Sequence, residues 1–204
     1  MRILAVADEE SARYYTWYRP GCLKEFDLII SCGDLSRACL EFLVTMANKP
    51  LLYVRGNHDD SFEKDPPEGC ICIDGRVHTF RGVRILGLGG SYRYKKEGIN
   101  MYTEQQMRKR IQRLWLPLHL GGGFDILVTH APARHINDFD SLSHRGFECF
   151  GELLHQYHPK IFIHGHIHRN YGIHIPRETV YGSTVIYNAF EDCAIDYPPR
   201  KETL

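Results

Sequence analysis

Five short segments of the 204-residue chain carry side chains that can bind a metal ion, and each segment follows an apolar run. In chain order these side chains belong to Asp8, Glu10, Asp34, Asn57, His58, His130, His166 and His168. Oxygen and imidazole ligands in this number, with a carboxylate able to bridge, are what two divalent ions about 4 Å apart require. The residue types therefore predict a metal site that can activate water.

The apolar runs before these residues are typical of buried strands. They cover residues 2–7, 27–32, 50–54, 125–128 and 160–163. In open α/β sheets, ligands bind at the carboxyl ends of the strands. We therefore expect the five runs to deliver their polar residues to one edge of the fold.

The segment 27–54 shows how two of these residues come together. Ser36 is suited to cap a helix after the second run, and Asn48 with Pro50 ends that helix. Its apolar positions are Cys39, Phe42, Leu43 and Met46. Strand, helix and strand then form a right-handed parallel crossover, which places Asp34 and Asn57 on the same sheet edge.

A second sheet is predicted after a polar loop. Short apolar runs at 70–73, 77–80 and 83–88 are separated by Asp-Gly and Arg-Gly pairs, which favour hairpins. We expect this sheet to be largely antiparallel. Two further short strands are expected near 171–175 and 184–188.

Two more helices are predicted in the second half. The first begins with a capping box at Thr103 and Gln106. It should bury Met107, Ile111, Leu114 and Trp115 and turn Arg108, Lys109, Arg110 and Arg113 outward. The second should bury Phe147, Phe150, Leu153 and Leu154 and end at Pro159.

Composition narrows the class of protein. The chain is 43% hydrophobic with no internal repeat, so we expect one domain over residues 1–204. Seven scattered cysteines without a CxxC pair disfavour a disulfide framework, and no signal peptide or membrane span is visible, which favours the cytoplasm. The formal net charge is zero, so a nucleic-acid partner would need a local basic patch. No membrane partner is expected, and the sequence leaves the oligomeric state open.

The motifs together resemble the calcineurin-like metallophosphoesterases, in particular small single-domain bacterial ones. Gly33-Asp34, Gly56-Asn57-His58-Asp59, Thr129-His130 and Gly165-His166-Ile167-His168 occur in the family's order, and the resemblance extends to about residue 188. It implies an α/β fold, a four-layer α/β/β/α sandwich of two mixed β-sheets flanked by helices.

The resemblance also implies roles for single residues. One ion would take Asp8, Asp34 and His168, and the other would take Asp34, Asn57, His130 and His166, with Asp34 bridging. His58 would stand beside the scissile phosphate and assist the leaving group, with Asp59 as its orienting partner. A hydroxide that bridges the two ions would attack phosphorus.

The first motif departs from the family's Asp-x-His pattern, because this chain has Asp8-Glu9-Glu10. The side chain of Glu10 is long enough to coordinate, and it would make the first site richer in oxygen. Such a site suits Mn²⁺, which we expect first, while iron, Mg²⁺, Ni²⁺ and Zn²⁺ stay possible. The alternative is that Glu10 points to solvent.

Candidate substrate contacts flank the metal motifs. Tyr92 and Arg93 lie in a loop that interleaves aromatic and basic residues, and His144 and Arg145 lie between two ligand segments. The alternatives are a solvated loop tip for Tyr92 and Arg93, and a helix cap or a surface charge for Arg145.

Three functions remain open on this evidence. The first is hydrolysis of a phosphodiester, with a small phosphate-ester or nucleotide-like substrate. The second is a phosphomonoesterase or protein phosphatase that uses the same site. The third is an interaction scaffold that resembles the small retromer subunit, for which eroded metal ligands would be expected.

Overall fold

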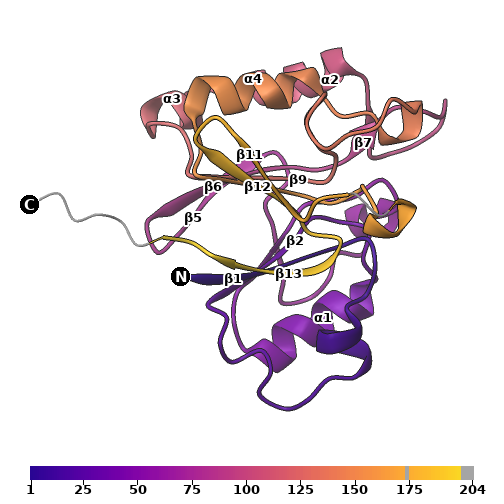
Figure 1. Cartoon of the computed structure of the whole chain (residues 1–204), viewed down its shortest axis with the longest axis vertical. Coiled ribbons are helices and arrows are strands. Elements are labelled where there is room, and N and C mark those ends of the chain that lie inside the picture. Colours follow the sequence, from indigo (N-terminus) through magenta and orange to yellow (C-terminus); the bar gives the residue numbers. More distant parts are fainter. Residues whose placement is uncertain (173–174, 199–204) are drawn as a thin grey trace, which may run out of the picture.

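Four layers make up the structure, a computed structural model that describes residues 1–172 and 175–198 (Figure 1). Two β-sheets pack face to face. The outer face of one sheet is covered by α1 (Arg37–Ala47), and that of the other by α2 (Glu104–Gln112), α3 (Trp115–Leu120) and α4 (Glu148–Tyr157). The predicted four-layer α/β/β/α sandwich is therefore confirmed. Within the described ranges, no helix has the length and apolar character needed to cross a bilayer.

The first sheet contains, in spatial order, β13 (Glu191–Asp196), β1 (Arg2–Ala7), β2 (Leu28–Ser31), β3 (Leu51–Tyr53) and β4 (Ile71–Cys72). Strands β1 to β4 run parallel, and β13 is antiparallel to β1. The crossover from β2 through α1 to β3 is thus confirmed as a parallel unit. Helix α1 begins after Ser36, whose hydroxyl accepts a hydrogen bond from the Cys39 amide, and ends at Asn48 in a left-handed conformation.

The second sheet contains β11 (Glu178–Tyr181), β12 (Thr184–Asn188), β10 (Ile161–His164), β9 (Ile126–Thr129), β6 (Val83–Leu88) and β5 (Arg76–Phe80). The pairs β12–β10, β10–β9 and β9–β6 are parallel, whereas β5–β6 and β11–β12 are antiparallel. Strands β9 and β10 end at the same edge as β1 and β2, because His130 after β9 bonds to Cys32 after β2 and His166 after β10 bonds to Asp8 after β1.

Alternation along the central strands builds three separate cores, one between the sheets and one under each helical layer. In β1, Ile3, Ala5 and Ala7 face the second sheet, whereas Leu4 and Val6 face α1. The same alternation divides β10, where Phe162 joins the cluster under α4. Because both faces of these strands are buried, the strands read as continuous apolar runs in the sequence.

Short elements complete the fold. They are a π-helical turn η1 (Ala12–Thr16), the 3₁₀ turns η2 (Asp60–Glu63), η3 (Leu142–His144) and η4 (Arg169–Tyr171), and a two-stranded sheet of β7 (Ser91–Tyr92) and β8 (Met101–Tyr102). The three 3₁₀ turns contain or adjoin residues of the site described below.

Several predictions about elements were wrong. The second sheet is mixed rather than largely antiparallel, because crossovers through α2, α3 and α4 connect three of its strands in parallel. Residues 71–72 pair with β3 in the first sheet. The strand expected near 171–175 is replaced up to Tyr171 by η4, and residues 173–174 lie outside the described part.

Side-chain burial differs from the prediction in two helices. Met46 of α1, which was predicted on the apolar face, is 45% exposed, whereas Leu40, which was not, is buried. The helix after Thr103 has the predicted capping box but ends at Gln112, and Trp115 begins α3 with 60% of its surface exposed. Arg110 is not on a solvated face, because its guanidinium contacts the buried carboxylate of Asp74.

Candidate metal centre

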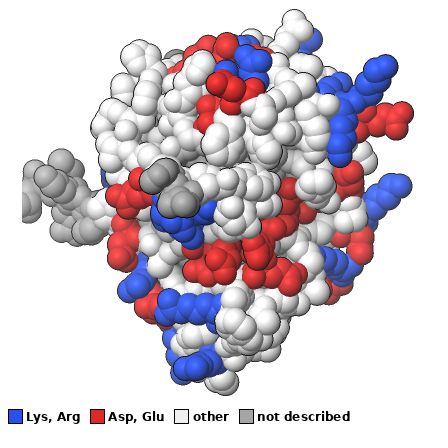
Figure 2. Space-filling model, turned by 45° about the vertical axis from the view of Figure 1, so that its right-hand side comes forward, with Lys and Arg blue, Asp and Glu red and all other residues white. Residues whose placement is uncertain are grey.

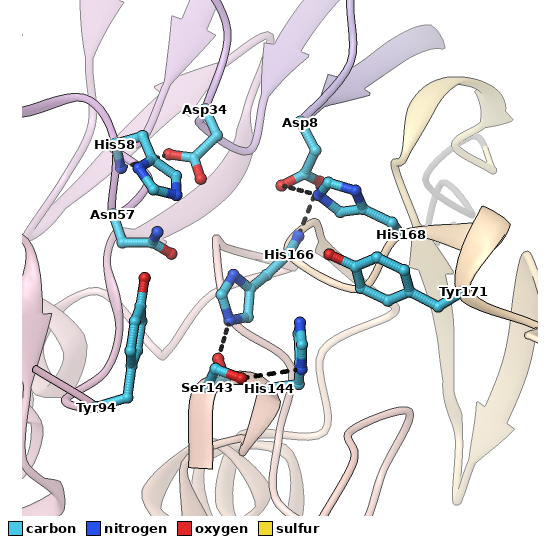
Figure 3. Close-up of a pocket in the computed structure, with 10 residues that line it drawn as sticks. All are labelled: Asp8, Asp34, Asn57, His58, Tyr94, Ser143, His144, His166, His168 and Tyr171. Carbon is cyan, nitrogen blue, oxygen red and sulfur yellow. Dashed lines mark hydrogen bonds and ion pairs between the residues drawn. The ribbon is translucent and has the colours of Figure 1, made fainter. Parts of the chain in front are cut away.

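Polar side chains from both sheets meet at one edge of the sandwich and line a cavity of about 290 Å³ (Figure 3). Asp8 and Asp34 follow strands β1 and β2 of the first sheet, and His130 and His166 follow strands β9 and β10 of the second. The residues that line the cavity are Asp8, Asp34, Asn57, His58, Tyr94, Ser143, His144, His166, His168 and Tyr171. The structure thus places five of the predicted ligands on the lining, together with His58, and His130 lies buried directly behind them.

His130 presents one ring nitrogen to two oxygen ligands. Its Nδ1 donates a hydrogen bond to the Cys32 carbonyl at 2.8 Å. Its Nε2 lies 3.1 Å from Oδ1 of Asn57 and 3.3 Å from Oδ2 of Asp34. Three side chains from three different strand ends therefore converge on one point, as ligands of a common ion do.

Asp8 contributes a carboxylate oxygen that accepts no hydrogen bond from the described residues. Its Oδ2 accepts a hydrogen bond from the amide of His166 at 2.8 Å, whereas its buried Oδ1 has no hydrogen-bond partner among the described residues. Burial raises the pKa of this carboxyl group to about 7. A buried anionic oxygen without a partner is costly, and a bound cation would remove that cost.

The two histidines after β10 are oriented by their neighbours. His166 donates from Nε2 to the Ser143 carbonyl at 2.7 Å, which leaves Nδ1 as its ligand atom, and burial lowers the pKa of the ring to about 3. The ring of His168 stacks on Tyr171 with centroids 4.8 Å apart, and its Nε2 lies 3.9 Å from Oδ1 of Asp8. Both rings are therefore held before any ion binds.

Charge coupling links Asp34 to His130. Burial favours the neutral form of Asp34, but the charge and hydrogen bond of His130 outweigh it and lower the pKa of Asp34 to about 2. Burial likewise favours neutral His130, but Asp34 and Asp8 raise its pKa to about 9. In the absence of an ion, a proton on His130 thus supplies part of the positive charge that the carboxylates require.

Strained backbone positions and close glycines shape the edge. Asp8, Asp34 and His166 adopt positive φ angles of 66°, 58° and 67°, a conformation that is uncommon for residues other than glycine. A Cβ on Gly56 would lie 2.0 Å from Oδ1 of Asp34, and one on Gly165 would lie 2.8 Å from Oδ2 of Asp8. Glycine at these positions lets the ligand loops approach each other.

His58 and Asp59 have different surroundings. His58 is exposed, and its amide donates to Oδ1 of Asp34 at 2.8 Å. Asp59 was predicted to orient the ring of His58, but its buried Oδ2 accepts hydrogen bonds from the amides of Asp34 and Gly56 at 2.9 and 2.7 Å. The described part of the chain shows no hydrogen bond between Asp59 and the His58 ring. Asp59 therefore holds the loop that carries Asp34.

Glu10 lies apart from the ligand cluster. Its Oε1 accepts a hydrogen bond from the hydroxyl of Ser36 at 2.5 Å, beside the first turn of α1. It is not among the residues that line the cavity. The Glu10 carboxylate thus contacts the residue that caps α1, and it is not directed towards the ion that Asp8 would hold.

One of the four predicted substrate contacts lies on the cavity wall, and the other three contact neighbouring protein groups. Of the four, His144 lines the cavity, with the hydroxyls of Ser141 and Ser143 at 2.8 and 3.1 Å from its Nδ1. Arg93 is directed to the Met101 carbonyl, Tyr92 packs on Phe147, and the guanidinium of Arg145 lies over the Tyr92 ring. These contacts hold the loops behind the cavity.

Ser143 and Tyr171 line the cavity and were not predicted. Tyr94 also lines it, and this residue lies in the predicted aromatic and basic loop that contains Tyr92 and Arg93. Ser143 acts through its carbonyl, and no sequence pattern reports the direction of a single carbonyl. Tyr171 follows His168 by three residues, and the turn η4 places it beside that ring.

The chemistry of the donor set fits divalent ions. Asp8, Asp34 and His130 offer ligand atoms within 4.8 Å of one another. Oδ1 of Asp8 accepts no hydrogen bond from the described residues, so a cation would supply the partner that it lacks. A cation could also bind between Nε2 of His130 and the two oxygens that face it. Carboxylate, amide and imidazole ligands together suit hard to intermediate divalent metals.

The chain belongs to the calcineurin-like phosphoesterase family, whose sequence profile matches residues 1–170. Human and mouse metallophosphoesterase domain-containing protein 1 are each 22% identical to this chain, in an alignment of 214 positions that covers 85% of the chain. The chain spans 62% of the length of these relatives.

Solved structures share the fold. The crystal structure of TT1561 of Thermus thermophilus aligns with a TM-score of 0.60 at 17% identity, over 93% of this chain and 89% of that chain. Another crystal structure aligns with a TM-score of 0.65 at 11% identity, over 93% and 90% of the two chains. The neighbours have metallophosphoesterase-like folds, and metal binding is a general property of the family.

Proposed function

We propose that this protein is a metal-dependent hydrolase of phosphodiesters. The observation that carries the proposal is the convergence of Asp8, Asp34, Asn57 and His130 at one edge, with a buried carboxylate oxygen that accepts no hydrogen bond from the described residues. The family membership of the chain supports the same reaction class.

Two ions are the arrangement that we propose. Asp8, Asp34 and His168 would hold one, and Asp34, Asn57, His130 and His166 would hold the other. When bound, such ions neutralise phosphate oxygens and lower the pKa of a bound water. We propose Mn²⁺ as the preferred ion because oxygen ligands form a large part of the set.

The chain's own residues complete the reaction. His58 is exposed at the rim, and its ring makes no hydrogen bond to the described residues, so the ring is available to donate a proton to the departing oxygen. The hydrogen bond from the His58 amide to Asp34 fixes the backbone from which that ring projects. Asp59 fixes the same loop from behind.

Charge around the cavity favours a diester over a monoester. No lysine or arginine occurs among the described residues that line it. Figure 2 shows acidic side chains gathered in the middle of the face that comes forward from the right of Figure 1. A phosphodiester carries one negative charge and a monoester carries up to two, so the diester meets less repulsion.

The test is hydrolysis of bis-p-nitrophenyl phosphate by purified protein supplied with Mn²⁺. We expect turnover that a chelator abolishes, and a higher kcat/KM than for p-nitrophenyl phosphate under the same conditions. Folded protein that is inactive with Mn²⁺, Fe²⁺, Co²⁺, Ni²⁺ and Mg²⁺ alike would favour an interaction scaffold. A preference for the monoester would instead favour a phosphomonoesterase.

A further inference from the structure

A second cavity adjoins the first at His58. It measures about 400 Å³ and is lined on its far side by Ser36, Arg37, Ser61 and Phe62. Asp34 and His58 line both cavities. His58, which is proposed to assist the leaving group, therefore lies at the boundary between the two cavities. The proposed function assigns a role to the first cavity and none to the second.

The second cavity is electronegative although an arginine lines it. The guanidinium of Arg37 contacts Glu41 at 2.6 Å and Glu68 at 3.4 Å, and it also contacts Asp65. Its single charge is thus surrounded by three carboxylates. The cavity therefore does not attract a second phosphate or a carboxylate, and it accommodates an uncharged or cationic group more readily.

The first cavity has flat aromatic walls. Figure 3 shows Tyr94 and Tyr171 on opposite sides of the space, with the ring of His144 between them below the metal ligands. The His144 ring is edge-on to Tyr171, with centroids 5.1 Å apart. A planar group that enters here meets aromatic surface on more than one side.

We propose that the substrate is a diester whose two arms occupy the two cavities, with an aromatic retained arm beside Tyr94 and an uncharged or cationic leaving arm beside Ser61 and Phe62. This assignment rests on the proposed function. In an in-line displacement, the leaving oxygen lies opposite the attacking water. The ligands cluster in the first cavity, so the leaving oxygen points past His58 towards the second.

The reaction balances as hydrolysis. A bond forms between the oxygen of water and phosphorus, and the bond between phosphorus and the leaving oxygen breaks. His58 gives a proton to that oxygen, and one proton of the attacking water passes to solvent, from which His58 is protonated again. The products are a phosphomonoester with the aromatic arm and a free alcohol.

Two substrates and two variants test the assignment. Bis-p-nitrophenyl phosphate has two large arms, whereas methyl p-nitrophenyl phosphate has one large leaving arm and a methyl group. Tyr94→Ala should raise KM about tenfold for the first substrate, as expected for a lost aromatic contact, and less than about twofold for the second. Ser61→Leu narrows the second cavity and should raise KM for both substrates alike.

Matched controls lie on β11 and in the turn that follows it. Tyr181 is 44% exposed, and Ser183 is exposed in the turn between β11 and β12. Tyr181→Ala and Ser183→Leu should leave both KM values unchanged. A methyl ester whose nitrophenyl leaving group also carries a carboxylate should have a severalfold lower kcat/KM in the wild type, because the second cavity is electronegative.

Direct binding gives a readout that does not depend on turnover. Phenylphosphonate presents only a retained aromatic arm, so calorimetric titration of Mn²⁺-loaded protein should show weaker binding in Tyr94→Ala and unchanged binding in Ser61→Leu. If the two variants alter both diesters and the phosphonate in the same way, the assignment of arms is overturned while the proposed function stands. If the wild type hydrolyses neither diester, both fail.

Discussion

At the scale of residues, His58 and Asp34 should have separable tasks. The His58 ring lies at the rim, whereas Asp34 faces His130 in the ligand cluster. We expect His58→Ala to lower kcat by about 10² to 10⁴, as for a lost general acid, with metal content unchanged. Asp34→Asn should lose metal, because it weakens the ligand assigned to both ions. Metal analysis beside kinetics checks this, and a metal-free His58→Ala protein would show that its role is wrongly assigned.

Glu10 gives a second expectation at this scale. Its contact with Ser36 places it outside the ligand cluster, so Glu10→Gln should leave metal stoichiometry and metal preference unchanged. The same substitution keeps a hydrogen-bond acceptor for Ser36, so stability should change by less than about 1 kcal/mol. Equilibrium dialysis followed by elemental analysis measures the metal content. Loss of one ion would return Glu10 to the ligand set.

Single residues also show what the sequence could predict. Asp34, Asn57, His130 and His166 follow buried strands, so chain position alone predicts that they meet at one edge. The contacts of Asp59 and Glu10 could not be predicted in the same way, because Asp59 accepts hydrogen bonds from two backbone amides and Glu10 accepts one from the Ser36 hydroxyl. The choice depends on which loop from elsewhere in the chain lies nearest.

At the scale of elements, two glycine-containing loops determine where Asp34 lies. Gly56 leaves no space for a side chain beside the Asp34 carboxylate. We expect Gly56→Ala to displace that carboxylate and to reduce metal affinity at least about tenfold, comparable to the loss of an outer partner of a ligand. Isothermal titration with Mn²⁺ measures the affinity.

Gly151 in α4 supplies the matched control. A Cβ at that position would meet no atom within 4 Å. Gly151→Ala should keep the metal affinity and stabilise the helix by up to about 1 kcal/mol. If both substitutions had the same effect on binding, the close approach of Gly56 to Asp34 would not matter for the site.

Element prediction succeeded where local and tertiary signals agree. The Ser36 cap, the left-handed Asn48 and the apolar flanks together define β2, α1 and β3. It failed at residues 71–72 and at Trp115. A two-residue strand has no periodicity of its own, and the exposure of Trp115 depends on where α2 ends, which the neighbouring α3 decides.

At the scale of the whole molecule, a buried ionic cluster joins the two sheets close to the site. The side chain of Asp74 is 1% exposed and contacts Arg55, which follows β3, and Arg110 of α2. It also accepts a hydrogen bond from the amide of Gly89, which follows β6, at 2.7 Å. One carboxylate therefore connects the first sheet, the second sheet and the helical layer above it.

Asp74→Asn should destabilise the protein more than the loss of an exposed ion pair. The amide retains the shape of the side chain but leaves the partly buried charges of Arg55 and Arg110 without a counter-charge, at a cost of about 3 kcal/mol. Glu152→Gln removes a partner of Arg108 at an exposed site and should cost less than about 1 kcal/mol. Urea unfolding of the metal-free proteins measures both free energies. Equal losses of unfolding free energy in the two variants would mean that the Asp74 cluster contributes no more to stability than an exposed ion pair. A larger loss in Asp74→Asn would show that the sheets, and with them the two halves of the ligand set, are held together partly by charge.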